Sequence, residues 1–142
     1  MKEILDAIPH RPPFLFLDQI TESGEDFLSA EKFVDPNLDF FKGHYPGFPI
    51  MPGVLTCESI FQAGSVLLSQ ISGDIGKKVP VIARIKNAKF KKMVRPGDTL
   101  KLSVKITERI GDVYYLRGKA VVDGKTAVDV EFACTLAVVE GK

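Results

Sequence analysis

Two side chains in the first half of this chain have the chemistry of a proton-transfer site. His44 lies in a segment, residues 35–52, whose prolines and glycines predict a long loop. Glu58 is the single charged side chain in the apolar segment that follows. Histidine exchanges protons near neutral pH, and a carboxylate in apolar surroundings needs a partner. This pair could perform acid–base chemistry on an acyl group, although a loop histidine is more often a surface residue and a lone glutamate can be structural.

A helix must position Glu58. Residues 53–71 are apolar around nearly the whole helical circumference, which predicts a buried helix. Its first backbone N–H groups, at Gly53 and Val54, have no partner within a helix and can bind developing negative charge. Gln62 lies one turn after Glu58 and continues a narrow polar stripe. A stripe of this kind can also simply face solvent.

The remainder of the chain predicts strands and tight turns. Apolar and polar residues alternate over 100–106 with the period of a half-buried strand. The expected elements are a short helix over 2–8, an extended proline-rich segment over 9–13, and strands over 14–20, 27–34, 80–94, 100–106, 113–122 and 126–139. Asp123-Gly124 is typical of a hairpin turn. This pattern predicts one α+β domain over residues 1–142, a curved antiparallel sheet wrapped around the helix, with some helix surface left for a second subunit.

Composition and charge exclude several classes of protein. The net charge of +1 argues against a general nucleic-acid-binding protein. No uncharged apolar run has the length of a membrane span, and the first eight residues lack the apolar core of a signal peptide, so a cytoplasmic protein is expected. Cys57 and Cys134 lie far apart in apolar segments and predict buried free thiols. No cysteine and histidine spacing predicts a metal site.

A basic segment follows the helix. It contains six cationic side chains and no acidic one: Arg84, Lys86, Lys89, Lys91, Lys92 and Arg95. Such a segment suits a small acidic partner, and it equally suits a solvated strand edge on which lysines prevent aggregation. Charge alone does not decide between the two.

At this point the residues resemble a known family, the 3-hydroxyacyl-[acyl-carrier-protein] dehydratases of the FabZ type. The resemblance rests on FKGHYPG at 41–47 and PIMPGVL at 49–55, followed by Glu58 and Gln62. It continues in PHRPPFL at 9–15, AKFKK at 88–92, RPGD at 95–98 and VDGK at 122–125, and so spans the chain in order. Glutamate at position 58 favours this type over the related FabA type, which has aspartate there.

The resemblance implies a hot-dog fold that works as a dimer and often as a trimer of dimers. It also implies a site shared by two subunits, with His44 of one chain facing Glu58 of the other. The implied reaction is loss of water from a (3R)-3-hydroxyacyl thioester to give the trans-2-enoyl thioester, without metal or cofactor. His44 would be the base and Glu58 would orient or protonate the departing hydroxyl.

The same resemblance assigns supporting roles. The N–H groups of Gly53 and Val54 would bind the enolate oxygen, with glycine allowing close substrate approach, and Gln62 would orient Glu58. The basic segment would dock an acidic acyl carrier protein through Lys89, Lys91, Lys92 and Arg95. Independently of the resemblance, the second histidine, His10, lies between two prolines in the N-terminal turn and is expected to be structural.

Some points stay open on the sequence. Phe61 stands where the family usually has a small residue, which leaves the length of the acyl tunnel open. Three other activities suit the same fold: a dehydratase that also isomerises the double bond, an acyl thioesterase, and an acyl-thioester binding module without turnover. The biosynthetic pathway and the choice between dimer and hexamer also stay open.

Overall fold

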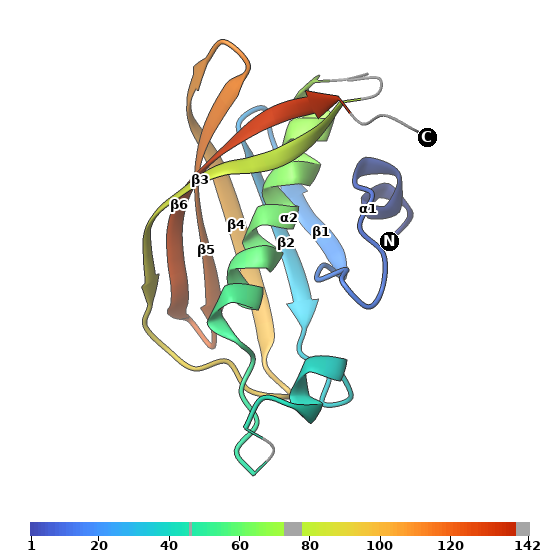
Figure 1. Cartoon of the computed structure of the whole chain (residues 1–142), viewed down its shortest axis with the longest axis vertical. Helices are drawn as coiled ribbons and strands as arrows, with labels where there is room; N and C mark the ends of the chain where they lie inside the picture. The colour runs from blue at the N-terminus through green and yellow to red at the C-terminus, as the bar shows by residue number, and fades with distance from the viewer. Residues whose placement is uncertain (46, 73–77, 139–142) are drawn as a thin grey trace.

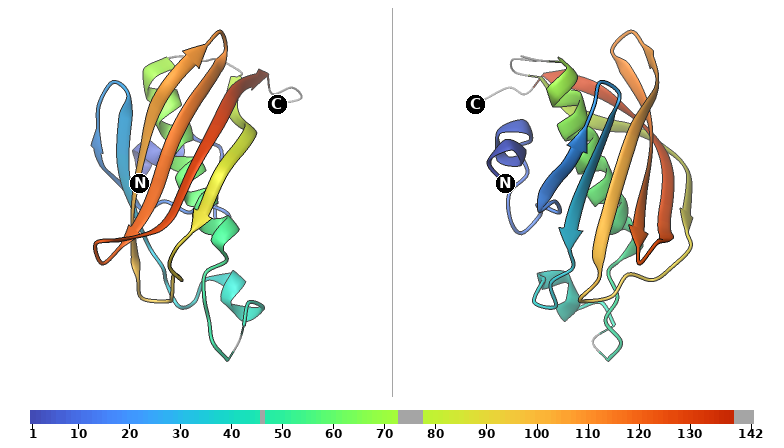
Figure 2. Two further views of the ribbon diagram at one scale, coloured as in Figure 1. Left: turned by 90° about the vertical axis from the view of Figure 1, so that its left-hand side faces the viewer. Right: turned by 180° about the vertical axis from the view of Figure 1, so that it is seen from behind.

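The computed structural model describes residues 1–45, 47–72 and 78–138. Its elements are α1 (Lys2–Ala7), β1 (Gln19–Ser23), β2 (Phe27–Phe33), the 3-10 helix η1 (Asp39–Lys42), α2 (Gly53–Ser72), β3 (Lys78–Phe90), β4 (Thr99–Ile110), β5 (Val113–Val122) and β6 (Lys125–Val138). The six strands form one antiparallel sheet in the order β1-β2-β4-β5-β6-β3. The sheet curves around α2, as the three views in Figures 1 and 2 show.

The core lies between the concave face of the sheet and α2. On the helix, Ile60 and Leu67 are completely buried, and the strands contribute alternate residues such as Leu102 and Leu116. Gly118 on β5 allows the helix to approach closely, because a Cβ there would lie 2.4 Å from Cγ2 of Ile60. This arrangement confirms the expected α+β fold with one central helix.

The first strand is shorter than expected. The sequence predicts a strand over 14–20, whereas β1 begins only at Gln19, so the prediction is wrong for residues 14–18. The reason is a tertiary contact, since the backbone of Phe14 and Phe16 bonds to the side-chain amide of Gln62 instead of to a neighbouring strand. Residues 8–18, between α1 and β1, cross α2 and are called the strap below.

The strand expected over 80–94 also ends early, at Phe90. The N–H of Lys91 donates to the carbonyl of Ala127 at 2.7 Å. Val94 then leaves the sheet, and its carbonyl accepts a hydrogen bond from the N–H of Met51 at 2.7 Å. This bond ties the segment after β3 to the loop in front of α2, and so helps to place the beginning of the helix.

The remaining elements lie close to their expected positions. The hairpin turn between β5 and β6 has positive φ at Asp123 (50°) and Gly124 (78°), as a two-residue turn requires. The last residue of the strand expected over 126–139 lies outside the described residues, as do residues 73–77 between α2 and β3. Within the described ranges, one helix, over Gly53–Ile71, is long and apolar enough to cross a membrane, and 67% of it is buried inside the fold, as befits a core helix.

Candidate active site

The loop in front of α2 fixes the ring of His44. Its Nδ1 lies 2.9 Å from the carbonyl oxygen of Ile50. Because a carbonyl can only accept, Nδ1 of the neutral ring carries the proton and donates it. The other nitrogen, Nε2, then carries a lone pair that has no hydrogen-bond partner among the described residues, and the side chain is half-buried. This is the tautomer that a general base needs.

The first turn of α2 presents free donors. The N–H groups of Leu55 and Thr56 both bond to the carbonyl of Pro52, whereas those of Gly53 and Val54 have no backbone acceptor among the described residues. The positive end of the helix dipole lies at the same place. The beginning of α2 can therefore bind an anionic oxygen.

A pocket of about 450 Å³ lies beside this first turn. Its lining residues come from the loop, the helix and the end of β3: Ile50, Met51, Gly53, Thr56, Phe90, Lys91, Lys92, Met93, Val94 and Val128. Gly53 has a structural reason to be glycine, since a Cβ there would lie 2.6 Å from Cδ1 of Phe90. Lys91 and Lys92 thus lie at a pocket that the start of the helix also lines.

The other two predicted docking residues lie outside that lining. Lys89 is exposed on β3, and Arg95 is exposed in the turn before β4. The guanidinium of Arg95 lies 4.6 Å from the centroid of the Phe48 ring, which holds it against the His44 loop. Cationic groups therefore extend from the pocket along the surface beside it.

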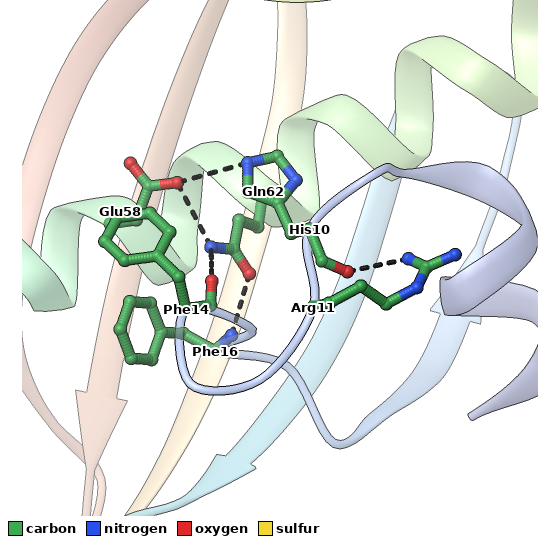
Figure 3. Close-up of polar contacts among 6 residues, drawn as sticks. All are labelled: His10, Arg11, Phe14, Phe16, Glu58 and Gln62. Atoms are coloured by element: carbon green, nitrogen blue, oxygen red, sulfur yellow. Dashed lines mark hydrogen bonds and ion pairs between the residues drawn. The ribbon is translucent and has the colours of Figure 1, made fainter. Parts of the chain in front are cut away.

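Glu58 lies on α2 at the centre of a polar cluster (Figure 3). The amide of Gln62 donates to Oε2 of Glu58 at 3.1 Å and to the carbonyl of Phe14 at 2.9 Å. The N–H of Phe16 donates to Oε1 of Gln62 at 2.8 Å. Gln62 is fully buried, so this side chain connects the carboxylate to the strap.

His10 also lies at this cluster, although the sequence suggested only a structural role for it. Its Nε2 lies 3.6 Å from Oε2 of Glu58 (Figure 3). The prolines around His10 indicate a rigid backbone at this position. They do not indicate which residue of the helix the imidazole ring faces. The contact depends on the strap crossing α2, which no local pattern encodes.

The structure does not bring His44 and Glu58 together within one chain. No hydrogen bond or ion pair joins the two side chains in the described ranges. His44 lies in the loop that projects beyond the start of α2 in Figure 1, whereas Glu58 lies further along the helix beside the strap. A single chain therefore carries the two halves of the predicted pair at separate places.

Burial makes the two cysteines poor nucleophiles. Desolvation raises the pKa of Cys134 to about 12. Desolvation, helped by the neighbouring charge of Glu58, also raises the pKa of Cys57. Both thiols are free and buried, as expected, and at neutral pH they are protonated. The described residues contain no cluster of three or more side chains suited to a metal ion.

Phe61 fills space in the core beneath the site. It is buried, and its ring lies 4.8 Å from that of Phe132 on β6, at an interplanar angle of 58°. Gly64, one turn further along α2, leaves room for the ring of Phe132, since a Cβ at position 64 would lie 3.0 Å from Cζ of that ring. Two aromatic rings thus occupy the layer between α2 and β6.

Comparison with known proteins defines the class. A family model described as the FabA-like domain matches residues 8–131. The 3-hydroxyacyl-[acyl-carrier-protein] dehydratase FabZ of Lactococcus lactis subsp. cremoris is 44% identical over 125 residues, covering 88% of this chain and 86% of its own. FabZ of Solibacter usitatus is 40% identical over 142 residues, covering 100% of this chain and 88% of its own. Among solved structures, the dehydratase heterocomplex ApeI:P of Xenorhabdus doucetiae has a TM-score of 0.80 at 14% identity, covering 94% of this chain and 90% of that one.

The chain therefore belongs to the FabA-like family, and its fold is the hot-dog fold. Within the family it is of the FabZ type, the 3-hydroxyacyl-[acyl-carrier-protein] dehydratases. The resemblance seen in the sequence is thus confirmed. The roles of individual residues stay predictions.

Proposed function

We propose that this protein removes water from (3R)-3-hydroxyacyl-[acyl carrier protein] to give the trans-2-enoyl thioester during fatty acid biosynthesis. The observation that carries the proposal is identity of at least 40% to FabZ dehydratases over most of the chain. The geometry supports it, because a histidine with a free Nε2 and a helix start with free N–H groups flank one loop.

The reaction follows from these groups. His44 Nε2 takes the proton from C2, while the N–H groups of Gly53 and Val54 stabilise the charge that develops on the thioester oxygen. The electron pair of the broken C2–H bond forms the C2–C3 double bond, and the C3–O bond breaks. Glu58 gives a proton to the departing hydroxyl, which leaves as water. The proton on His44 returns to Glu58 through solvent before the next turnover.

We infer that two chains form each site, His44 from one and Glu58 from its partner. The separation of these residues within one chain supports this. So does the edge of the sheet at β3, where Val81 and Ile85 are exposed, as are Phe90 and Val54 nearby. A long edge strand with exposed apolar residues is stabilised when a second copy covers it. A dimer is the smallest assembly that completes the site, and a hexamer of three dimers is compatible with it.

The acyl carrier protein is the proposed partner, and the cytoplasm the proposed location. Lys91 and Lys92 at the pocket, with Lys89 and Arg95 beside it, would attract an acidic carrier and direct its acyl group toward Gly53. Reversing two of these charges should raise KM for the carrier-bound substrate and weaken its salt dependence, while leaving kcat for a short thioester analogue unchanged.

Mass spectrometry of 3-hydroxyacyl carrier proteins of several chain lengths tests the proposal. Loss of one water with wild type, and not with Glu58→Gln, is the expected result. Release of the free acid would instead identify a thioesterase, and binding without a mass change would identify a binding module. A shift of the double bond to the next carbon, seen by chromatography of the product, would add an isomerase activity.

A further inference from the structure

We propose that His10 is a positioning residue for Glu58, which it holds together with Gln62 so that one carboxylate oxygen is fixed and the other faces the substrate. The inference deepens the dehydratase function proposed above and rests on it. It is carried by the contact between Nε2 of His10 and Oε2 of Glu58, at 3.6 Å.

The strap holds the backbone of His10 from both sides. On the N-terminal side, the guanidinium of Arg11 donates to the carbonyls of Leu5 and Ile8 at 2.9 and 2.8 Å. It also donates to the carbonyl of His10 itself at 2.7 Å. On the C-terminal side, the N–H of Phe14 donates to the carbonyl of Arg11 at 2.9 Å. Figure 3 shows the imidazole directed from this strap toward the helix. The ring is therefore a fixed part of the site, since its backbone is bonded on each side.

The surroundings of the ring determine which nitrogen carries the proton. Nδ1 of His10 is buried and has no hydrogen-bond partner among the described residues. A proton on Nε2 faces the acceptor oxygen Oε2 of Glu58, whereas a proton on Nδ1 would have no acceptor among the described residues. The proton of the neutral ring therefore lies on Nε2, the atom that faces Glu58.

Two donors then converge on one oxygen. The amide of Gln62 lies 3.1 Å from Oε2 of Glu58, and Nε2–H of His10 approaches the same atom. No hydrogen bond from the described residues reaches Oε1, so that oxygen is available to a substrate hydroxyl. The distance from His10 is slightly longer than a hydrogen bond, as is common for catalytic contacts before substrate binds.

No other charged side chain of the described residues competes for the ring. Glu58 is the only carboxylate of the described residues within ion-pair distance of His10, and Arg11 on the same strap is engaged with backbone carbonyls. Cys57, next to Glu58 on α2, is a buried thiol whose pKa is raised by desolvation and by that carboxylate. Glu58 is therefore the charged partner of His10 among the described residues.

The first test compares two substitutions by steady-state kinetics on a 3-hydroxyacyl carrier protein. His10→Gln keeps an N–H donor at about the reach of Nε2, whereas His10→Leu keeps only bulk. We expect His10→Leu to lower kcat by up to about 10-fold, the effect of losing one hydrogen-bonding contact that positions Glu58, with KM within twofold. His10→Gln should retain most of kcat. Equal kcat for wild type and His10→Leu would overturn the inference, as would equal losses in both variants with unchanged melting temperatures.

The second test needs no turnover and keeps the inference falsifiable if a variant fails to fold. The chain has two histidines, so the ring nitrogens of a protein labelled with ¹⁵N-histidine can be assigned by NMR. We expect opposite tautomers, with the proton on Nε2 in His10 and on Nδ1 in His44. A proton on Nδ1 of His10 would refute the proposed contact whatever the enzyme does. If wild type released no enoyl product, the proposed function would fail and the positioning role with it. If wild type is active and His10→Leu has the same kcat as wild type, only the positioning role fails.

Discussion

The amide of Gln62, on α2, is expected to contribute more to stability than any single polar side chain of the strap. Gln62→Met keeps the length and bulk of the side chain and removes its hydrogen bonds to the strap and to Glu58. The substitution leaves the buried N–H of Phe16 without an acceptor. An unsatisfied buried donor of this kind costs ~1–3 kcal/mol. The carbonyl of Phe14 belongs to a half-exposed residue, so water can replace its partner and its loss costs less.

Together these losses should lower the free energy of unfolding by about 2–4 kcal/mol. Gln19→Met is a matched control, because Gln19 makes one exposed hydrogen bond, to Glu31, at 2.9 Å. Its effect should stay within about 0.5 kcal/mol. Urea denaturation of both variants and wild type, at one protein concentration, measures the difference. If Gln62→Met lost no more stability than Gln19→Met, the strap would not depend on this amide and the reasoning would fail.

Three further predictions concern the catalytic groups and the buried thiols. His44→Ala should lower kcat by ~10²–10⁴-fold, as expected for a general base, and turnover near the wild-type rate would remove that assignment. Mixed His44→Ala and Glu58→Ala subunits should recover part of the activity if two chains share each site, and no recovery despite proven subunit exchange would argue against sharing. Because the pKa of Cys134 is raised from 9.0 to about 12, its folded state holds a proton that the unfolded chain releases, so this contribution to stability should be complete below pH 9 and decline as pH rises toward 12. A smaller decline in Cys134→Val than in wild type, measured by denaturation at pH 8 and pH 10.5, is the expected result.

Local patterns in the sequence predict most of the fold. The alternation over 100–106 becomes buried Leu100, Leu102 and Val104 with polar residues on the opposite face of β4. The apolar circumference of residues 53–71 becomes the buried α2. These predictions succeed because strand and helix periods follow from backbone geometry and from one hydrophobic core.

The errors occur where side chains far apart in the sequence compete with local preference. Phe14 to Leu17 is an apolar run of the kind that strands contain. The N–H of Phe16 nevertheless donates to the side-chain amide of Gln62, 46 residues later in the sequence, so this run lies outside the sheet. The early end of β3 has a similar cause, since Val94 pairs with Met51 in front of α2. Neither partner can be identified from the periodicity of either segment.

The same distinction explains why the sequence singled out His44 and Glu58 as candidates but not the neighbour of Glu58 in the fold, His10. His44 and Glu58 stand out by residue type, because each is unusual for its segment. His10 is ordinary in a polar turn, and only the strap, pinned to α2 through Gln62, makes it a neighbour of Glu58. Residues 1–13 also carry Ile4 and Ile8, which are buried in the core, so a deletion of residues 1–13 should lower the stability of the sheet and α2. It should remove His10 from the site, and its loss of kcat should therefore be at least that of His10→Leu.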